Sequence, residues 1–445
     1  MSSSVKLARP TKRVGGWIGE IPASWGFAPL KRFCSVTLGK MIPIVGDSDA
    51  PSGSPYLRAA HVQPLGRLWL EDIKLMQFSQ VEACRLTLTK GDVVVVEGGA
   101  GYGRAAFLEN DLEGWGFQNS INRVRTSASG HGRYVNYLFS GIQGAGVFET
   151  LINTSTIPHL TAEKLEVVAV SWPPLDEQRQ IAQYLDRETG KIDELITKQE
   201  QLVATLTERR QAVIAQAVTS GLHTDIDVKE SGVEWIGIIP AHWIIGQVKN
   251  LGSISLGKMI QPEQTQPGQF HAPYMRAANV QPDGVLKLND VKQMWFNETE
   301  HAALDLKAGD VVVVEGGVGG YGRAAFIERD VEGWGYQNSI NRVRVARGDG
   351  RFLTYMLIAA RSLGFIAAIC VGVSMPHFTA EKLARFQIPI PPIREQSAIA
   401  DHLDAVTAKI DSLTLNAGLV IETLRERRAA LISAAVTGKI DVRGL

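Results

Sequence analysis

Apolar residues recur in two long segments of the chain at alternating three- and four-residue steps, which is the spacing of a coiled-coil helix. The apolar positions are Ile181, Leu185, Ile192, Leu195, Leu202, Leu206 and Val213 in the first segment, and Ile399, Leu403, Val406, Ile410, Leu413, Val420, Leu424 and Leu431 in the second. Each row lasts about five heptads and predicts a helix of about 40 residues, about 60 Å long. Each segment follows a Pro-Pro pair, which can precede a helix but cannot continue one. We expect the two helices to pair antiparallel, with polar residues at Gln199, Arg209 and Arg427 fixing the register.

The segments upstream of the two helices have a different pattern. Val93–Val96 follows a Gly-Asp pair and ends near two glycines, as a buried strand does. Short apolar runs and many glycines surround it, which predicts an α+β globule with substantial sheet. In Gln118–Arg125, Ile and Val alternate with polar residues, so we expect one face of this strand to pack inward and the other to be displayed.

The whole pattern occurs twice. The run LGKMI at Leu38–Ile42 returns at Leu256–Ile260, and Val93–Arg125 matches Val311–Arg344 at about 28 of 33 aligned positions, with one glycine inserted in the second copy. The period of about 218 residues is far above the 20–50 residues that are typical of solenoids. The sequence therefore predicts a pseudo-two-fold internal repeat: two similar mixed α/β domains separated by two long antiparallel coiled-coil helices.

The pattern also predicts where these parts begin and end. We expect a first domain at residues 1–172, a central helix at 173–222, a second domain at 223–390 and a C-terminal helix at 391–445. We call the two domains the first and second heads. At roughly 100–200 residues per domain, the length of 445 residues accommodates this arrangement.

Composition narrows the function classes. The 46 Lys and Arg residues balance 46 Asp and Glu residues, which excludes a polycation that binds nucleic acid by bulk charge but allows a locally basic face. The three cysteines, Cys34, Cys84 and Cys370, form no CxxC pair, which excludes a disulfide scaffold or zinc knuckle and fits a reducing compartment.

No segment has the pattern of a signal peptide or membrane span. The most apolar stretch, Tyr355–Met375, is interrupted by Arg361, so a buried helix is expected there. We expect a cytoplasmic protein without membrane contact.

A glycine-rich motif follows the valine strand in both copies, at Glu97–Arg104 and Glu315–Arg323. It lacks the Lys and hydroxyl of a phosphate-binding P-loop, so its glycines more simply allow close backbone approach. The arginines at its end, next to a tyrosine, could contact a phosphate or a guanine edge, or form a surface ion pair. The candidates are Tyr102 and Arg104, with Tyr321 and Arg323 in the second copy.

Two further polar groups are candidates for DNA contact. Gln and Asn can form paired hydrogen bonds to adenine and Arg to guanine, although buried Gln and Asn can equally satisfy backbone groups. The first group is Gln118, Asn119, Asn122 and Arg123, repeated as Gln337, Asn338, Asn341 and Arg342. The second is Arg58, His61 and Gln63, repeated as Arg276, Asn279 and Gln281. The His-to-Asn difference between copies fits either a position that tunes specificity or neutral drift.

No catalytic motif is found. The sequence has no HExxH or GxSxG motif, and we recognise no methyltransferase or nuclease signature, no metal site and no cofactor site. A binding protein is therefore expected. Two alternatives remain: an adaptor whose twin heads bind protein, and an enzyme with a duplicated site around Glu97 and Glu315.

The segments PPLDEQRQIAQYLDRETGKID at 173–193 and PPIREQSAIADHLDAVTAKID at 391–411, each completed by ERR and AVT, resemble the specificity subunit of type I DNA restriction–modification systems. The resemblance implies that each head is a target recognition domain that contacts one half of a bipartite DNA site in the major groove. It implies that the helices separate the heads and dock two modification subunits, joined by two restriction subunits. S-adenosylmethionine, ATP and Mg would be bound by those partners, and a modification-only system is an alternative within the family.

The two heads are more alike than the family pattern implies. Similar heads related by a pseudo-two-fold axis should recognise similar half-sites, so we expect a near-palindromic bipartite target. Differences between half-sites should map to Pro43–Pro55 against Gln261–Pro273, to the inserted glycine, and to position 61 against 279. The helices should set the spacer, and an insertion of about four residues would move a head by roughly 5–6 Å, or one to two base pairs.

Overall fold

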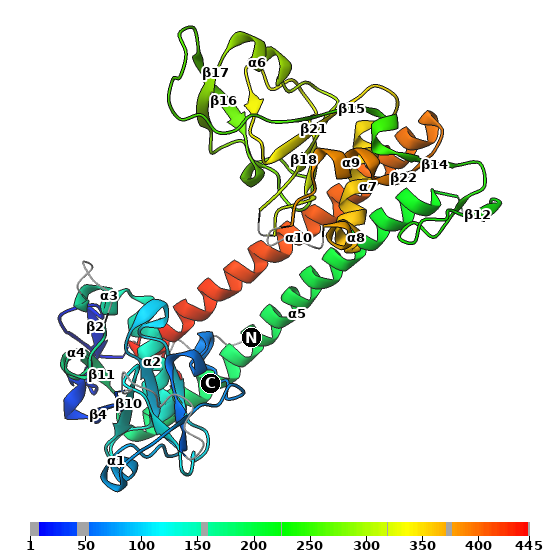
Figure 1. Cartoon of the computed structure of the whole chain (residues 1–445). Coiled ribbons are helices and arrows are strands. Elements are labelled where there is room, and N and C mark those ends of the chain that lie inside the picture. The colour runs from blue at the N-terminus through cyan, green and yellow to red at the C-terminus, as the bar shows by residue number, and fades with distance from the viewer. Residues whose placement is uncertain are drawn as a thin grey trace. The chain divides into compact units, whose positions relative to one another are not determined.

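The computed structural model describes residues 9–41, 53–152, 159–223, 225–317, 319–370 and 376–443. The chain forms two compact units, one made of Met1–Glu200 with Leu419–Leu445 and the other of Gln201–Gly418. The long helices are α5, Leu175–Ser220, and α10, Ile393–Val436 (Figure 1). The units group the chain differently from the linear partition at residues 172, 222 and 390, because part of each long helix belongs to each unit.

A four-stranded antiparallel sheet is the centre of each head. In the first head the strand order is β4-β10-β7-β8, and in the second it is β15-β21-β18-β19. The strands are β4 Cys34–Leu38, β10 Ile121–Thr126, β7 Val93–Val96 and β8 Ala105–Phe107, with β15 Gly252–Leu256, β21 Ile340–Val345, β18 Asp310–Val314 and β19 Ala324–Phe326 as their counterparts.

Smaller elements cover both faces of this sheet. In the first head they are β1 Thr11–Arg13, β2 Glu20–Pro22, β3 Gly26–Pro29, β5 Ser54–Leu57, β6 Leu75–Met76, β9 Gly116–Phe117, β11 Ala169–Trp172, α1 Gln80–Arg85, α2 Gly132–Gly144, α3 Val147–Leu151, α4 Ala162–Val167 and the short turns η1 Leu30–Arg32, η2 Ala59–His61, η3 Pro64–Gly66 and η4 Gly99–Gly101. In the second head they are β12 Val228–Glu230, β13 Ile238–Pro240, β14 Ile244–Gln247, β16 Phe270–Met275, β17 Lys292–Phe296, β20 Gly335–Tyr336, β22 Gln387–Ile390, α6 Glu298–Ala303, α7 Gly350–Ser362, α8 Phe365–Ile369, α9 Ala380–Arg385 and the turns η5 Val248–Asn250 and η6 Ala277–Asn279.

The valine strand β7 is buried on both sides. Because successive side chains of a strand point to opposite faces, Val93 and Val95 join the core under helix α2, whereas Val94 and Val96 join a second core under the small sheet β6-β5-β9. The prediction that strand β10 displays one face was wrong, since its residues from Ile121 to Val124 are all buried. Its outward face is covered by residues that are distant in sequence.

The long helices run antiparallel within the first unit. Asp193 pairs with Arg428 at 2.9 Å and Glu200 with Arg425 at 3.4 Å, so later residues of α5 meet earlier residues of α10. In the second unit Arg210 pairs with Asp411 at 2.9 Å. The cross-helix pairs are therefore made by Arg210, Arg425 and Arg428, and not by the predicted Arg209 and Arg427, which are exposed.

The predicted apolar row is only partly buried. Leu195, Leu202, Leu413 and Val420 are 48%, 43%, 53% and 42% exposed. On α5 of the first unit the buried positions include the row Ile181, Leu185, Thr189, Ile192 and Ile196. Three of these four steps are four residues long, because a helix of 3.6 residues per turn drifts away from a strict heptad.

The end of α10 completes the core of the first unit. Ile432, Ala435 and Val436 are buried with residues of the first head, and the Ser171 hydroxyl donates to the Val436 carbonyl at 2.6 Å. The stretch Tyr355–Met375, expected to be one buried helix, is divided between α7, whose residues from Phe352 to Ala360 are buried, and α8, and its residues 371–375 lie outside the described residues. Within the described ranges no helix is long and apolar enough to cross a membrane.

Candidate nucleic-acid interface

The repeated motifs gather at one end of each head sheet. Because neighbouring strands are antiparallel, the carboxyl ends of β4 and β7 lie beside the amino ends of β10 and β8. The register pairs Leu38 with Asn122 and Val96 with Ile121. We define the motif end of the first head as residues 38–41, 97–104 and 118–120. The motif end of the second head is 256–259, 315–317, 319–323 and 337–339.

Backbone contacts fix the motif end. The Lys40 amide donates to the Phe117 carbonyl at 2.9 Å, and the Asn119 amide donates to the Lys40 carbonyl at 2.8 Å. A Cβ on Gly39 would lie 2.2 Å from the Gln118 carbonyl oxygen, and one on Gly257 would lie 2.3 Å from that of Gln337. Only glycine fits this approach, so the LGKM and QNS segments are held together in both heads.

The displayed side chains come from both segments. Gln118 and Asn119 are partly exposed, and their counterparts are the partly exposed Gln337, whose amide donates to Ser339, and the exposed Asn338. Met41 and Met259 are 71% and 74% exposed. These amides with an adjacent apolar side chain can contact base edges and thymine methyl groups.

Lys40 and Lys258 belong to the same surface but were not among the predicted site residues. Lys40 pairs with Glu82 at 2.8 Å and Lys258 with Glu300 at 2.5 Å. The hydrogen bond from Lys40 lowers the pKa of Glu82 to about 2. The repeated LGKMI run was the signal that could have identified both lysines and both methionines.

The four predicted site residues on strands β10 and β21 lie inside the heads. The Asn122 amide donates to the Leu160 carbonyl at 2.9 Å, and Asn341 donates to Phe378 at 3.1 Å. Arg123 donates to the Thr87 carbonyl at 2.5 Å and is 6% exposed. These contacts correspond to the alternative in which buried polar groups satisfy the backbone.

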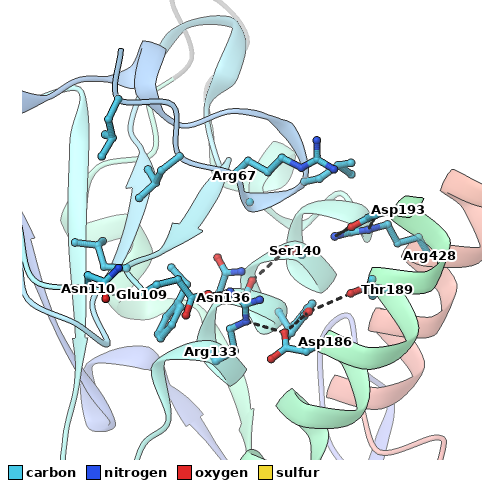
Figure 2. A pocket seen from close by; sticks show the side chains of 18 of the residues that line it. Arg67, Glu109, Asn110, Arg133, Asn136, Ser140, Asp186, Thr189, Asp193 and Arg428 are labelled. Atoms are coloured by element: carbon cyan, nitrogen blue, oxygen red, sulfur yellow. Dashed lines mark hydrogen bonds and ion pairs between the residues drawn. The ribbon is translucent and has the colours of Figure 1, made fainter. Parts of the chain in front are cut away.

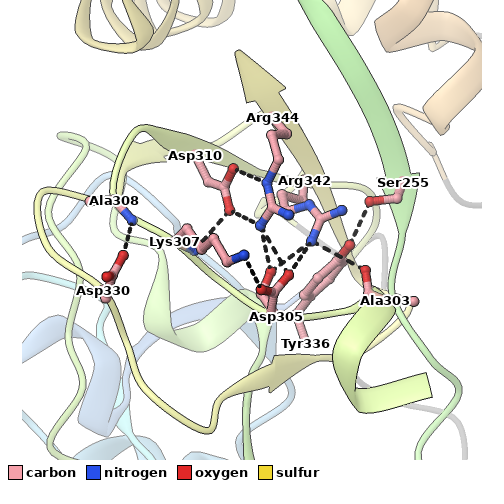
Figure 3. Close-up of polar contacts among 10 residues, drawn as sticks. All are labelled: Ser255, Ala303, Asp305, Lys307, Ala308, Asp310, Asp330, Tyr336, Arg342 and Arg344. Atoms are coloured by element: carbon pink, nitrogen blue, oxygen red, sulfur yellow. Dashed lines mark hydrogen bonds and ion pairs between the residues drawn. The ribbon is translucent and has the colours of Figure 1, made fainter. Parts of the chain in front are cut away.

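Arg342 repeats the role of Arg123 in the second head. It donates to the Asp305 carbonyl at 2.6 Å, beside the Arg344–Asp310 ion pair at 2.8 Å (Figure 3). Its guanidinium carbon lies 5.6 Å from the centre of the Tyr336 ring. Arg342 therefore holds the sheet to the segment before β18 and is not displayed.

The second predicted polar group forms a turn next to the motif end. The Ala59 amide donates to the Ser120 hydroxyl at 3.2 Å, and Arg58 is ion-paired with Asp72. The buried His61 accepts the Arg58 amide at 3.2 Å on Nδ1, and burial lowers its pKa. Gln63 donates to the Ala60 carbonyl.

The second head builds the same turn with Asn279. Its Oδ1 accepts the Arg276 amide at 3.0 Å, and its Nδ2 donates to the Lys287 carbonyl at 2.7 Å. Arg276 is ion-paired with Asp290, and Gln281 donates to the Ala278 carbonyl. The His-to-Asn difference is therefore between two buried side chains with the same structural task. The other predicted region of difference, Pro43–Pro55, lies mostly outside the described residues.

The glycine-rich loop presents an arginine in each head. Within the described part of the first head, the Arg104 guanidinium has no hydrogen bond or ion pair, whereas Arg323 donates to the Gly319 carbonyl at 3.1 Å. Neither arginine has a carboxylate partner among the residues that the structure describes. Tyr102 and Tyr321 are half-buried and accept hydrogen bonds at their carbonyls from Gln143 and Arg361.

Glu97 and Glu315 lie at the base of the loop. Burial raises the pKa of both carboxyl groups, and their oxygens lie 3.9 and 3.8 Å from Nδ1 of His159 and His377. In the described residues no group of three His, Cys, Asp or Glu side chains is placed to hold a metal ion.

A cavity of about 570 Å³ in the first unit is a weaker candidate (Figure 2). Two of its three arginines are neutralised: Arg133 pairs with Asp186 at 2.7 Å and Arg428 with Asp193 at 2.9 Å. Asn136 lines the cavity, and its buried Oδ1 has no partner. The motif end displays an arginine without a carboxylate partner in each head, so it is the better candidate for a nucleic-acid interface.

Comparisons with known proteins agree with this architecture. The model of the type I restriction modification DNA specificity domain matches residues 24–204 and 240–420. The chain therefore belongs to the family of type I restriction–modification DNA specificity proteins, which recognise DNA and are not catalytic. The resemblance inferred from the sequence and the predicted α+β class with two similar heads are confirmed.

Two relatives and one structure illustrate the likeness. The chain is 22% identical to the type I restriction enzyme MjaVIII specificity subunit of Methanocaldococcus jannaschii, over 96% of this chain and 95% of the relative. It is 24% identical to the EcoBI specificity subunit of Escherichia coli, over 65% of this chain and 63% of that relative. A chain from a structural study of complex assembly and conformational transition of the type I R-M system matches with a TM-score of 0.69 and 14% identity, over 94% of this chain and 99% of that chain.

Proposed function

We propose that each head contacts one half of a bipartite DNA target through its motif end, and that the two halves are nearly palindromic. The observation that supports this most directly is the repeated geometry of the two motif ends. Gly39 and Gly257 make the same close approach, and Gln118–Asn119 and Gln337–Asn338 occupy equivalent places beside them. Like surfaces should select like half-sites on opposite strands.

The residues at the motif ends divide into base-reading and phosphate-binding groups. Gln118 and Asn119 supply paired donors and acceptors suited to adenine, and Met41 supplies apolar surface for a thymine methyl group. Arg104 supplies a guanidinium free for a phosphate or guanine. The formal net charge of zero means that partner subunits supply much of the salt-dependent phosphate binding.

We further propose that two modification subunits dock along the long helices and that two restriction subunits complete the assembly in the cytoplasm. Apolar side chains on the helices are exposed in the chain alone and could be covered by such partners: Leu195, Leu202, Leu413, Leu415 and Leu419. S-adenosylmethionine, ATP and Mg belong to the partners in this proposal.

The test is a genome-wide map of N6-methyladenine in cells with and without the gene. Loss of one split motif with two similar halves is expected when the gene is deleted. A lost motif with dissimilar halves would contradict the near-palindromic target but keep the specificity function. An unchanged map, with the modification subunits expressed, would favour the protein-binding adaptor.

A further inference from the structure

Two differences between the heads meet at the glycine-rich loop of the second head. This loop has one more glycine than the first, and helix α7 carries Arg361 where helix α2 carries Gln143. Arg361 Nη2 donates to the Gly319 carbonyl at 3.1 Å, and Arg323 Nη2 donates to the same oxygen at 3.1 Å. The longer loop thus provides a carbonyl that holds two guanidinium groups together.

Holding the loop does not require an arginine. In the first head Gln143 Nε2 donates to the Tyr102 carbonyl at 3.3 Å. Arg361 Nε makes the equivalent bond to the Tyr321 carbonyl at 3.2 Å. The Gln therefore anchors the loop as the Arg does, and what Arg361 adds is a positive charge beside Arg323.

The two charges have no counterion within the described residues. Because both Nη2 atoms bond one oxygen, they lie no more than about 6 Å apart. Burial and the charge of Arg323 both lower the pKa of Arg361. Arg323 Nε is buried without a hydrogen-bond partner. Two neighbouring guanidinium groups without a carboxylate have the donor geometry that binds a phosphate.

We propose that Arg323 and Arg361 form a clamp for one phosphodiester of the target DNA, present in the second head and absent from the first. This inference rests on the proposed DNA contact of the motif ends and adds a residue to it. The clamp binds backbone and not bases, so it strengthens the grip of the second head without changing the sequence that it selects.

The experiment measures binding of the chain, complexed with its modification subunits, to a duplex carrying the methylated motif, at 50 to 200 mM salt. Arg361→Gln, which installs the side chain of the first head, should reduce the slope of log K against log salt by about 0.9 in magnitude. The wild type should then lose about three- to fourfold more affinity than the variant across this range. Arg361→Lys should retain most of the slope because it keeps the charge.

Two further variants separate the outcomes. A reciprocal variant, with a glycine inserted after Gly101 and Gln143→Arg, should steepen the slope by a similar amount. Arg385→Gln removes an exposed charge paired with Glu381 on α9 and should leave the slope unchanged. Equal slopes for wild type and Arg361→Gln, with tight wild-type binding, would overturn the clamp alone. Absence of salt-dependent binding by the wild-type complex would instead overturn the proposed function.

Discussion

The two heads keep the same residues where one backbone segment packs against another and differ at side chains around the glycine-rich loop. At the motif ends, a Cβ on Gly39 or Gly257 would lie 2.2 or 2.3 Å from a carbonyl oxygen, and both copies keep glycine. Around the loop, Gln143 in one head corresponds to Arg361 in the other. Only glycine fits where the backbone segments pack this closely, whereas side chains on the surrounding surface can be replaced without loss of the fold.

The cavities next to the heads show the same contrast. In the first unit the cavity has a volume of about 570 Å³, and its counterpart in the second unit has about 120 Å³. Thr354 and Ile358 of the second copy stand where the first has Asn136 and Ser140. The larger Ile358 side chain lines the smaller cavity, so the two heads have the same fold but cavities of different size.

The largest expected effect is the loss of the shared backbone contact. Gly39→Ala and Gly257→Ala should each lower the unfolding free energy of their unit by about 2–3 kcal/mol, because the new Cβ meets a backbone carbonyl that cannot move cheaply. Thermal denaturation of the purified chain should show a decrease of about 5–10 °C for the affected unit. Gly190→Ala on helix α5, where a Cβ meets nothing within 4 Å, is the control and should stabilise slightly. Equal melting temperatures for Gly39→Ala and wild type would contradict the packing argument.

A smaller effect is expected from the displayed amides. Gln118→Ala and Gln337→Ala should each weaken discrimination at one base of one half-site by about 1–3 kcal/mol, or about 5- to 160-fold. The two variants should relax the same position in opposite halves of the motif, as seen by methylation of duplexes with single-base changes. Relaxation at unrelated positions would show that the heads use their motif ends differently.

The smallest effect is expected at the buried turn. His61→Asn, which copies the second head, should leave the methylated motif unchanged. Because burial lowers the folded-state pKa of His61 below its value of 6.5 in the unfolded chain, the wild-type turn loses stability as pH falls through and below 6.5. The variant should lose less stability than wild type on acidification, which urea unfolding at pH 7.5 and 5.5 would measure. A changed motif would restore this position as a determinant of specificity.

The sequence predicts the repeat, the long helices and the buried valine strand because these depend on local spacing. It does not predict that both faces of β10 are covered, because the covering strand β5 is more than sixty residues away along the chain. For the same reason it could not distinguish displayed Gln118 from buried Asn122, whose partner Leu160 comes from a distant segment. Leu195 and Leu413 were predicted to lie in the apolar row between the helices, but both are exposed. The helices keep more than 3.5 residues per turn, so positions at strict heptad spacing rotate away from the contact.

The end of helix α10 has a consequence for how the protein is made. Ile432 and Val436 of α10 pack into the core of the first head, whose own residues end near Trp172. Part of this core therefore stays uncovered until α10 has been synthesised. At about 5–20 residues per second, that interval lasts tens of seconds on the ribosome. A nonsense codon before Ile432 would therefore leave the earliest-made head with an incomplete core. The nascent first head therefore depends on translation as far as Val436, and truncated products should be recognised and removed by proteolysis.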